Sequence, residues 1–259
     1  MLKAEMKNIQ SLGKQTDQLK NFCIDYNGET NHFEKECEKF MRRFVADVFS
    51  ESVTITQEAK SKFGLLCQHN EGRCWFARLM DAQRVEIKEV EEVILFRLVQ
   101  YYAIVLFECY IADDFAPAAS LLNMSFTYYH VSSFSELPHD SPKKSDTPSK
   151  LYVFEYLKDQ AIWKTMRFWT SAFLFAVDSE RQKRPKFGSW RSLNEEQQRE
   201  LNQNEEYSAF AHLGTFLYIM KSLNVAKEMK EVFISKISTI ENLSQEQLHE
   251  LIERVEKAE

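Results

Sequence analysis

Residues 67–73, CQHNEGR, place an arginine six positions after a cysteine, which is the Cys-x5-Arg spacing of cysteine phosphatases. That chemistry requires a thiolate of lowered pKa, backbone N–H groups directed at a phosphate and an arginine that holds its oxygens. Here Leu66 precedes Cys67, no strand pattern leads into it, and Glu71 would bring a carboxylate among the phosphate-binding groups. We therefore prefer a buried thiol at Cys67 and a loop arginine at Arg73, and we rank a cysteine phosphatase last among three functional hypotheses.

Other catalytic and metal-binding patterns are missing from the sequence. The six histidines form no H-x3-H or HExxH pair, the five cysteines have no Cys-x2-Cys spacing, and no Gly-rich phosphate loop or GxSxG motif occurs. The adjacent Asp113 and Asp114 have no third ligand nearby in the sequence and suit a helix cap better than a metal. We predict that the chain is not an enzyme and that it binds neither a cofactor nor a metal.

Two polar segments could carry regulation or binding. Ser141-Pro142 and Thr147-Pro148 are candidate sites for proline-directed phosphorylation, although such dipeptides are also frequent in unmodified tethers. A basic turn could contact an acidic partner or a phosphoinositide head group. A solvated helix C-terminus, where cations suit the helix dipole, explains this turn more simply. Its cations are Arg181, Lys183, Arg184 and Lys186.

The longest apolar run is 93–112, VILFRLVQYYAIVLFECYIA. A helix of this length would be about 30 Å long and could span a bilayer. Arg97 and Glu108 lie inside it, and each would cost about 2.5–3.5 kcal/mol to insert. The sequence therefore predicts a core helix that is buried on nearly all sides, and no transmembrane segment.

Charged residues inside that core helix need partners. Arg97 and Glu108 are eleven positions apart, about 16 Å along one face, so they cannot pair with each other. We predict that both are structural buried charges and that Arg167 is a third, a candidate partner for Glu108.

Composition bounds the fold class. The chain of 259 residues has only six Gly and five Pro and a net charge of −6, with charges of both signs interspersed. These values predict an all-α protein without a basic field for nucleic acid. We expect a flexible N-terminal arm at 1–31 and one domain at 32–258, with about nine helices around the central helix and a Ser/Pro-rich flexible loop at 132–150. The odd number of cysteines and the apolar neighbours of Cys67, Cys74 and Cys109 predict reduced thiols. Reduced thiols indicate a cytosolic or nuclear protein, and we predict a cytoplasmic one.

Periodicity and caps define individual helices. Apolar spacing predicts the first helix at about 32–49, and capping-box patterns predict helix starts at Thr54, Ser192 and Ser244. Gly72 is expected to break the chain before a short helix that opens near Trp75. Further helices are expected at about 161–181, 207–223 and 226–238.

Several strings resemble a known family: GRCWFA at 72–77, DAQR at 81–84, the run from 96 to 130 that contains ADDFAPA, LKDQAIWKTMRFWTSAFLFAV at 157–177, and HLGTF at 212–216. They resemble the central helical domain of the SET-binding factors, which are myotubularin-related pseudophosphatases. The resemblance is closer to stand-alone cytoplasmic proteins made of that domain, and it covers roughly 33–258. It implies a helical domain without active-site residues. It does not transfer the activities of the DENN, lipid-binding and phosphatase modules of those larger proteins.

These observations lead to three hypotheses of different classes. The first is a non-enzymatic cytoplasmic adaptor or scaffold that binds a protein of unknown identity in membrane traffic or signalling. The second is peripheral, weak membrane or phosphoinositide association through the basic turn. The third is the cysteine phosphatase through Cys67 and Arg73.

Overall fold

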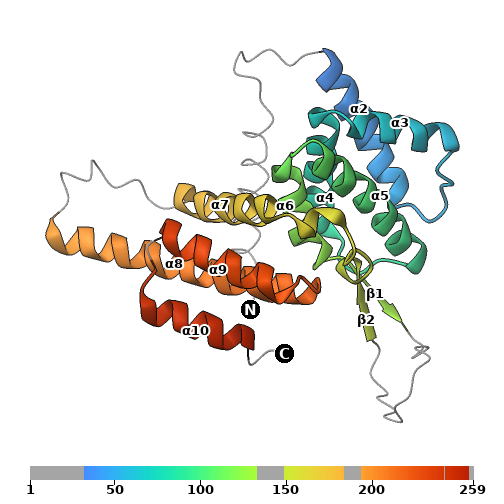
Figure 1. Ribbon diagram of the computed structural model, residues 1–259. Coiled ribbons are helices and arrows are strands. Elements are labelled where there is room, and N and C mark those ends of the chain that lie inside the picture. The colour runs from blue at the N-terminus through green and yellow to red at the C-terminus, as the bar shows by residue number, and fades with distance from the viewer. Residues whose placement is uncertain (1–31, 133–148, 184–193, 242, 257–259) are drawn as a thin grey trace, which may run out of the picture. The chain divides into compact units, whose positions relative to one another are not determined.

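The computed structural model describes residues 32–132, 149–183, 194–241 and 243–256 (Figure 1). The fold is predominantly α-helical, which confirms the predicted class. The first group of helices is α2 (His32–Val48), α3 (Gln57–Cys67), α4 (Asn70–Glu86), α5 (Glu92–Ile111) and α6 (Phe115–Ser125). Two strands, β1 (Tyr129–Ser132) and β2 (Ser149–Tyr152), and the 3-10 turn η1 (Val153–Tyr156) follow. The chain continues with the 3-10 turn η2 (Ala161–Lys164), α7 (Met166–Lys183), α8 (Glu195–Ser222), α9 (Lys227–Glu241) and α10 (Gln245–Glu256).

Within the predicted domain, the helices gather into two compact units, one ending at Gln160 and the other beginning at Ala161. The sequence did not indicate this division, because the abrupt change of composition comes earlier, at the Ser/Pro-rich stretch. That stretch lies inside the first unit, between β1 and β2. Residues 1–31 and 133–148, where we predicted an arm and a flexible loop, lie outside the described residues.

The core of the first unit is a cluster of aromatic rings from α2, α3, α4 and α5. The ring of Phe63 stacks on Phe44 at 4.4 Å between centroids and meets Tyr101 edge-on at 5.1 Å. Phe76 of α4 contacts Phe63 from another side at 5.2 Å. Such rings bury large apolar areas and add edge-to-face attraction, so they fix how the four helices pack.

The start of α4 differs from the prediction. Gly72 does not break the chain but lies in the first turn of α4, a helix of 17 residues. A Cβ at this position would lie 2.1 Å from the carbonyl oxygen of Leu66, inside the backbone of α3. The glycine is therefore needed for close packing of two helix ends, not for a break.

Side-chain caps set several helix starts, at positions partly different from those predicted. Thr56, not Thr54, caps α3 by accepting a hydrogen bond from the Ala59 amide at 3.2 Å. Asn194 caps α8 with a reciprocal contact to Gln197, while Ser192 lies outside the described residues. The predicted cap at Ser244 is confirmed, because its Oγ accepts from the Gln247 amide.

The sequence did not predict the antiparallel pair β1–β2, in which Tyr129 faces Tyr152 and Ser132 faces Ser149. On its other side, Tyr129 exchanges backbone hydrogen bonds with Lys88 and Val90 in the connection that precedes α5. The strands have four residues each, too short for an alternating pattern to stand out. Their pairing depends on contacts between distant segments, which local periodicity does not report.

The second unit packs α7, α8 and α9 around aromatic side chains. The indole N–H of Trp169 donates to the carbonyl of Trp163 at 2.7 Å, and both side chains are buried. The ring of Phe216 in α8 contacts Phe173 of α7 and Phe233 of α9. The helix predicted at 207–223 is longer than expected and begins at Glu195, because its polar first half is started by the Asn194 cap.

Candidate functional site

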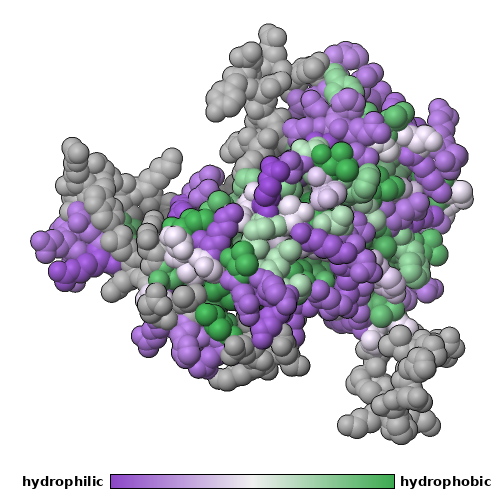
Figure 2. Space-filling view, in the orientation of Figure 1, coloured by the Kyte–Doolittle hydropathy of each residue, from purple (hydrophilic) through white to green (hydrophobic). Residues whose placement is uncertain are grey.

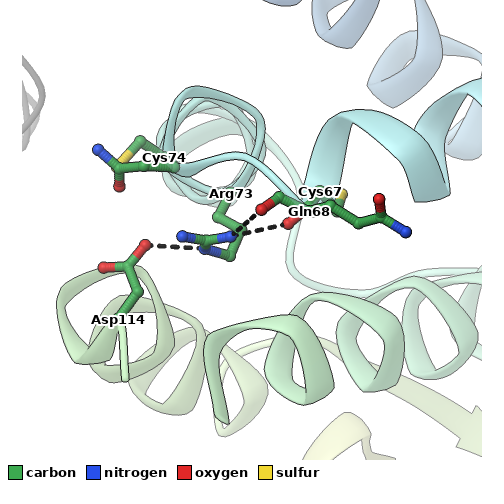
Figure 3. Close-up of polar contacts among 6 residues, drawn as sticks. Cys67, Gln68, Arg73, Cys74 and Asp114 are labelled. Carbon is green, nitrogen blue, oxygen red and sulfur yellow. Dashed lines mark hydrogen bonds and ion pairs between the residues drawn. The ribbon is translucent and has the colours of Figure 1, made fainter. Parts of the chain in front are cut away.

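The Cys67–Arg73 segment forms a junction between helix ends (Figure 3). The side chain of Arg73 is 5% exposed, and its Nε donates to the Asp114 carboxylate at 2.8 Å. Its Nη1 donates to the backbone carbonyls of Cys67 and Gln68, at 3.0 and 2.9 Å. These two carbonyls belong to the C-terminal end of α3, where a cation also suits the helix dipole. Arg73 therefore joins the end of α3 to the start of α6.

A turn at the end of α5 brings Asp114 to this junction. Asp113 adopts a left-handed conformation with φ of 53°, and the Asp114 amide donates back to the carbonyl of Cys109. Aspartate is one of the few residue types that tolerates this conformation. Asp114 occupies the N-cap position of α6 but makes no side-chain cap, because its carboxylate binds Arg73. We predicted that these aspartates cap a helix. Asp114 does lie at the N-cap position of α6, but its side chain does not make the capping hydrogen bond.

The thiol of Cys67 does not have the environment that phosphatase chemistry requires. Cys67 is fully buried, and desolvation raises the pKa of its thiol far above the usual value. Arg73 lowers that pKa, but burial outweighs it, and its guanidinium is held by Asp114 and by two backbone carbonyls. A group held in this way cannot also bind phosphate oxygens. The geometry supports the buried thiol that we preferred, although we placed Arg73 in a loop and it lies in α4.

Two further buried thiols lead to a prediction about alkaline pH. Burial raises the pKa of Cys37 from 9.0 to about 11, and it raises that of Cys109 still further. Between pH 9 and 11, unfolded chains release these thiol protons while the folded chain keeps them, so the free energy of unfolding falls as pH rises. Urea titrations at pH 8, 9, 10 and 11 should show this fall, and Cys37→Ala should flatten it relative to the parent protein. A slope unchanged by Cys37→Ala would contradict the assignment.

One cysteine departs from the predicted reduced state. Cys37, Cys67 and Cys109 are free thiols, but Cys74 is disulfide-bonded. The prediction of reduced thiols is therefore wrong for Cys74. The cytoplasmic location that we derived from reduced cysteines stays a prediction.

The three predicted buried charges are not buried. Arg97 and Glu108 are half-buried, and Arg167 is exposed. Arg97 belongs to α5, and its side chain reaches the segment that follows the end of α2. Its guanidinium donates to the carbonyls of Ser50 at 2.6 Å and Val53 at 2.8 Å. We overestimated burial because we assumed that α5 is covered all round.

Arg97 nevertheless has a structural role that can be measured. Its contacts close the turn between α2 and α3, and hydrogen bonds to a charged group contribute about 1.5–3 kcal/mol. We expect Arg97→Met to lower the free energy of unfolding by about 2 kcal/mol, since methionine keeps the apolar stem but loses the donors. Chemical denaturation measures this, with Arg43→Met as the control because the Arg43 side chain is 88% exposed. Equal effects of the two substitutions would contradict the role.

The basic turn and the phosphorylation candidates are only partly described. Arg181 pairs with the buried carboxylate of Glu241 at 2.8 Å, so its charge serves the packing of α7 against α9. Lys183 is exposed at the end of α7. Arg184, Lys186, Ser141 and Thr147 lie outside the described residues. Of the four cations we expected at a lipid or acidic partner, Arg181 is therefore already engaged.

The most prominent surface feature of the first unit is an apolar face on α5. Only one side of α5 is buried; its opposite side exposes large apolar residues, and Figure 2 shows hydrophobic residues at the surface where α5 lies in Figure 1. Phe107 is 53% exposed, and Ile111 is 63% exposed. We define the α5 face as Val93, Phe96, Phe107, Tyr110 and Ile111.

Sequence reasoning missed this face, although a signal was present. Arg97, Gln100 and Glu108 fall on one narrow stripe of α5, which marks a side of the helix that does not face the core. The exposed residues lie on and beside that stripe. The apolar run concealed them because it is apolar nearly throughout.

α5 is also long and apolar enough to cross a membrane by length and composition. In its most apolar 18-residue window, 44% of the residues are buried in the fold. The buried side packs on α2, α3, α4, α6 and η1. This packing supports the core-helix prediction, with one side left open. Within the described ranges, no group of three or more His, Cys, Asp or Glu side chains could hold a metal ion.

Comparison with known proteins finds a human relative. The chain is 29% identical to a human protein described as "Uncharacterized protein KIAA0513", over 84% of this chain and 75% of that protein. No family model matches the sequence, and no solved structure matches it. The resemblance to the SET-binding factors stays a prediction.

Proposed function

We propose that this protein is a non-enzymatic protein-interaction domain that binds its partner through the α5 face. The observation that carries the proposal is the exposure of five large apolar side chains on one side of a single helix. Soluble domains rarely expose contiguous apolar patches unless the patch binds something. The helix itself is fixed by its buried side, so the face is presented on a rigid element.

The chemistry of the face suits an apolar partner surface. Phe96, Phe107 and Tyr110 are 48%, 53% and 38% exposed. Aromatic side chains bury about 150–250 Å² each, so these three expose together on the order of 300 Å². At about 25 cal/mol per Å², covering that area contributes roughly 7 kcal/mol before the costs of association. This is enough for a specific contact when neighbouring residues complete the interface.

The cellular role is proposed from the resemblance. A rigid helical domain that presents an apolar face suits an adaptor or scaffold in membrane traffic or signalling. The buried thiol of Cys67 and the guanidinium of Arg73, which is bound to Asp114, do not suit catalysis. Peripheral membrane association through the basic turn stays an alternative prediction, and the pairing of Arg181 with Glu241 gives it no support.

Quantitative affinity capture from cytosol tests the proposal. The bait is the full chain, compared with Phe107→Glu, which places a charge on the α5 face. The matched control is Val232→Glu in α9, because Val232 is 56% exposed and Phe107 is 53% exposed. We expect a stoichiometric partner that the parent and Val232→Glu retain and that Phe107→Glu loses. A partner retained equally by all three would show that binding uses another surface, and no stoichiometric partner for any of them would contradict the proposal.

A further inference from the structure

We infer that the α5 face pairs with the α5 face of a second copy of this chain, with the two helices antiparallel. This inference rests on the proposed function, because it names the partner at the same face. Three properties of α5 carry it: the spacing of the exposed positions, their symmetry about the middle of the helix, and the charges on one flank.

The exposed positions repeat as they do in paired helices. One set recurs every seven residues at Val93, Gln100 and Phe107. A second set, offset by three, is Phe96, Ala103 and Tyr110. All six are exposed or half-buried, and none carries a full charge. Apolar positions at alternating spacings of three and four are the seam along which two α-helices pack. A helix that only covered its own core would not need a second seam on its outer side.

The pattern is symmetric about a point midway between residues 101 and 102. An antiparallel two-fold axis at that point sets Phe96 opposite Phe107 of the other copy. The same axis sets Val93 opposite Tyr110, and Gln100 opposite the small Ala103. Isologous contacts require such self-complementarity, since each residue meets the position related to it by the axis. Large residues thus lie opposite large or branched ones at the ends, and the amide of Gln100 has room in the middle.

The charges beside the seam are complementary in the same arrangement. At 100° per residue, Arg97 and Glu108 project from one flank of the α5 face, within about 20° of each other around the helix. Neither has an ion-pair partner among the described residues, and the guanidinium of Arg97 binds neutral backbone carbonyls. The antiparallel axis brings Arg97 of each copy nearly level with Glu108 of the other. Opposite charges would then lie near each other along both borders of the apolar seam, while each guanidinium keeps its backbone carbonyls.

The area of the face indicates a modest affinity. A standard interface buries about 800 Å² on each partner, and the aromatic residues of the α5 face expose on the order of 300 Å². The exposed ring of Tyr156 extends the face, because it contacts Phe96 edge-on at 5.5 Å. We therefore expect a dimer that dissociates on dilution.

Sedimentation velocity of the full chain, over a dilution series from about 1 to 200 µM, tests the inference. We expect a monomer–dimer equilibrium in the parent protein. Phe107→Glu should raise the dissociation constant on the order of 100-fold, because the two-fold axis introduces the charge twice. Val232→Glu should leave the constant within about twofold of the parent. Far-UV circular dichroism of each variant confirms that the helices are retained.

Two further variants test orientation and charge. Glu108→Lys should raise the dissociation constant about tenfold, since it would face Arg97 of the other copy. For orientation, Val93→Cys and Tyr110→Cys are oxidised separately and as a mixture. The antiparallel arrangement predicts cross-links in the mixture that exceed those in either variant alone. Preferential cross-linking within each single variant would instead indicate parallel helices and overturn the orientation.

A parent protein that stays monomeric up to 200 µM would overturn self-pairing, as would a dimer that Phe107→Glu leaves intact. These failures are separable from failure of the proposed function. A monomer that still captures a partner in a Phe107-dependent way preserves the interaction domain and assigns the face to another protein. A dimer sensitive to Phe107→Glu that captures nothing else supports self-pairing and contradicts the adaptor role.

Discussion

Replacing Gly72 with alanine should destabilise the protein by at least about 3 kcal/mol, because the new Cβ overlaps backbone that cannot move aside. The Cβ would lie 2.1 Å from the carbonyl oxygen and 2.5 Å from the carbonyl carbon of Leu66. Relief requires the start of α4 to move away from the end of α3. That movement would also stretch the contacts of Arg73 with the carbonyls of Cys67 and Gln68. Urea denaturation followed by circular dichroism measures the loss.

The matched control is Gly64→Ala in α3. A Cβ at Gly64 meets nothing within 4 Å, and Gly64 lies inside a helix, where alanine is favoured by about 1 kcal/mol. The two substitutions add the same methyl group and should change stability in opposite directions. If Gly72→Ala were as well tolerated as Gly64→Ala, the close approach of α3 and α4 would be wrong.

Arg73→Ala should cost about 3–5 kcal/mol, the second large effect, because it removes one partner of a mostly buried charge pair. It would leave the Asp114 carboxylate, which is 19% exposed, without its cation at 2.8 Å. Two carbonyls at the end of α3 would lose a donor at the same time. The measurement is again the free energy of unfolding in urea.

Arg43→Ala is the reference for Arg73→Ala. Arg43 lies 4.0 Å from Asp47, and its side chain is 88% exposed, so the pair should contribute no more than about 1 kcal/mol. A loss below about 1 kcal/mol for Arg73→Ala would mean that the junction does not hold α3 and α6 together. A phosphatase role would instead predict lost turnover with unchanged stability.

Much of the fold could be predicted from sequence because the elements are long helices with periodic apolar faces. α2 and α5 begin and end within one or two residues of their predicted bounds, and the cap at Ser244 was found by its spacing to Gln247. The short strands β1 and β2 were not predictable in this way, since they pair across a separation in sequence and leave no local pattern. Gly72 was misjudged because a glycine that breaks a helix and a glycine that lets two helices approach closely look the same in a single sequence.

The candidate site was less accessible to sequence reasoning. α5 is buried on one side and not on the other. How much of a helix is buried depends on how many helices pack around it, and the hydropathy of the sequence does not give that number. Tyr101 and Tyr102 face the core while Phe107 and Tyr110 face outward, although all four are aromatic. The contact between Arg73 and Asp114 joins positions 41 residues apart, a separation that motif spacing does not cover.

Hydroxyl-radical footprinting of the unmodified chain tests the central claim, use of the α5 face, most directly. Oxidation of Phe107 and Tyr110 is measured by mass spectrometry in the dilute purified protein, in the concentrated protein and in cytosol. Tyr218 of α8, which is 67% exposed, is the internal reference. The account predicts that Phe107 and Tyr110 are readily oxidised on dilution and protected in at least one of the other two conditions, while Tyr218 is unchanged. Equal oxidation of Phe107 and Tyr110 in all three conditions would contradict it.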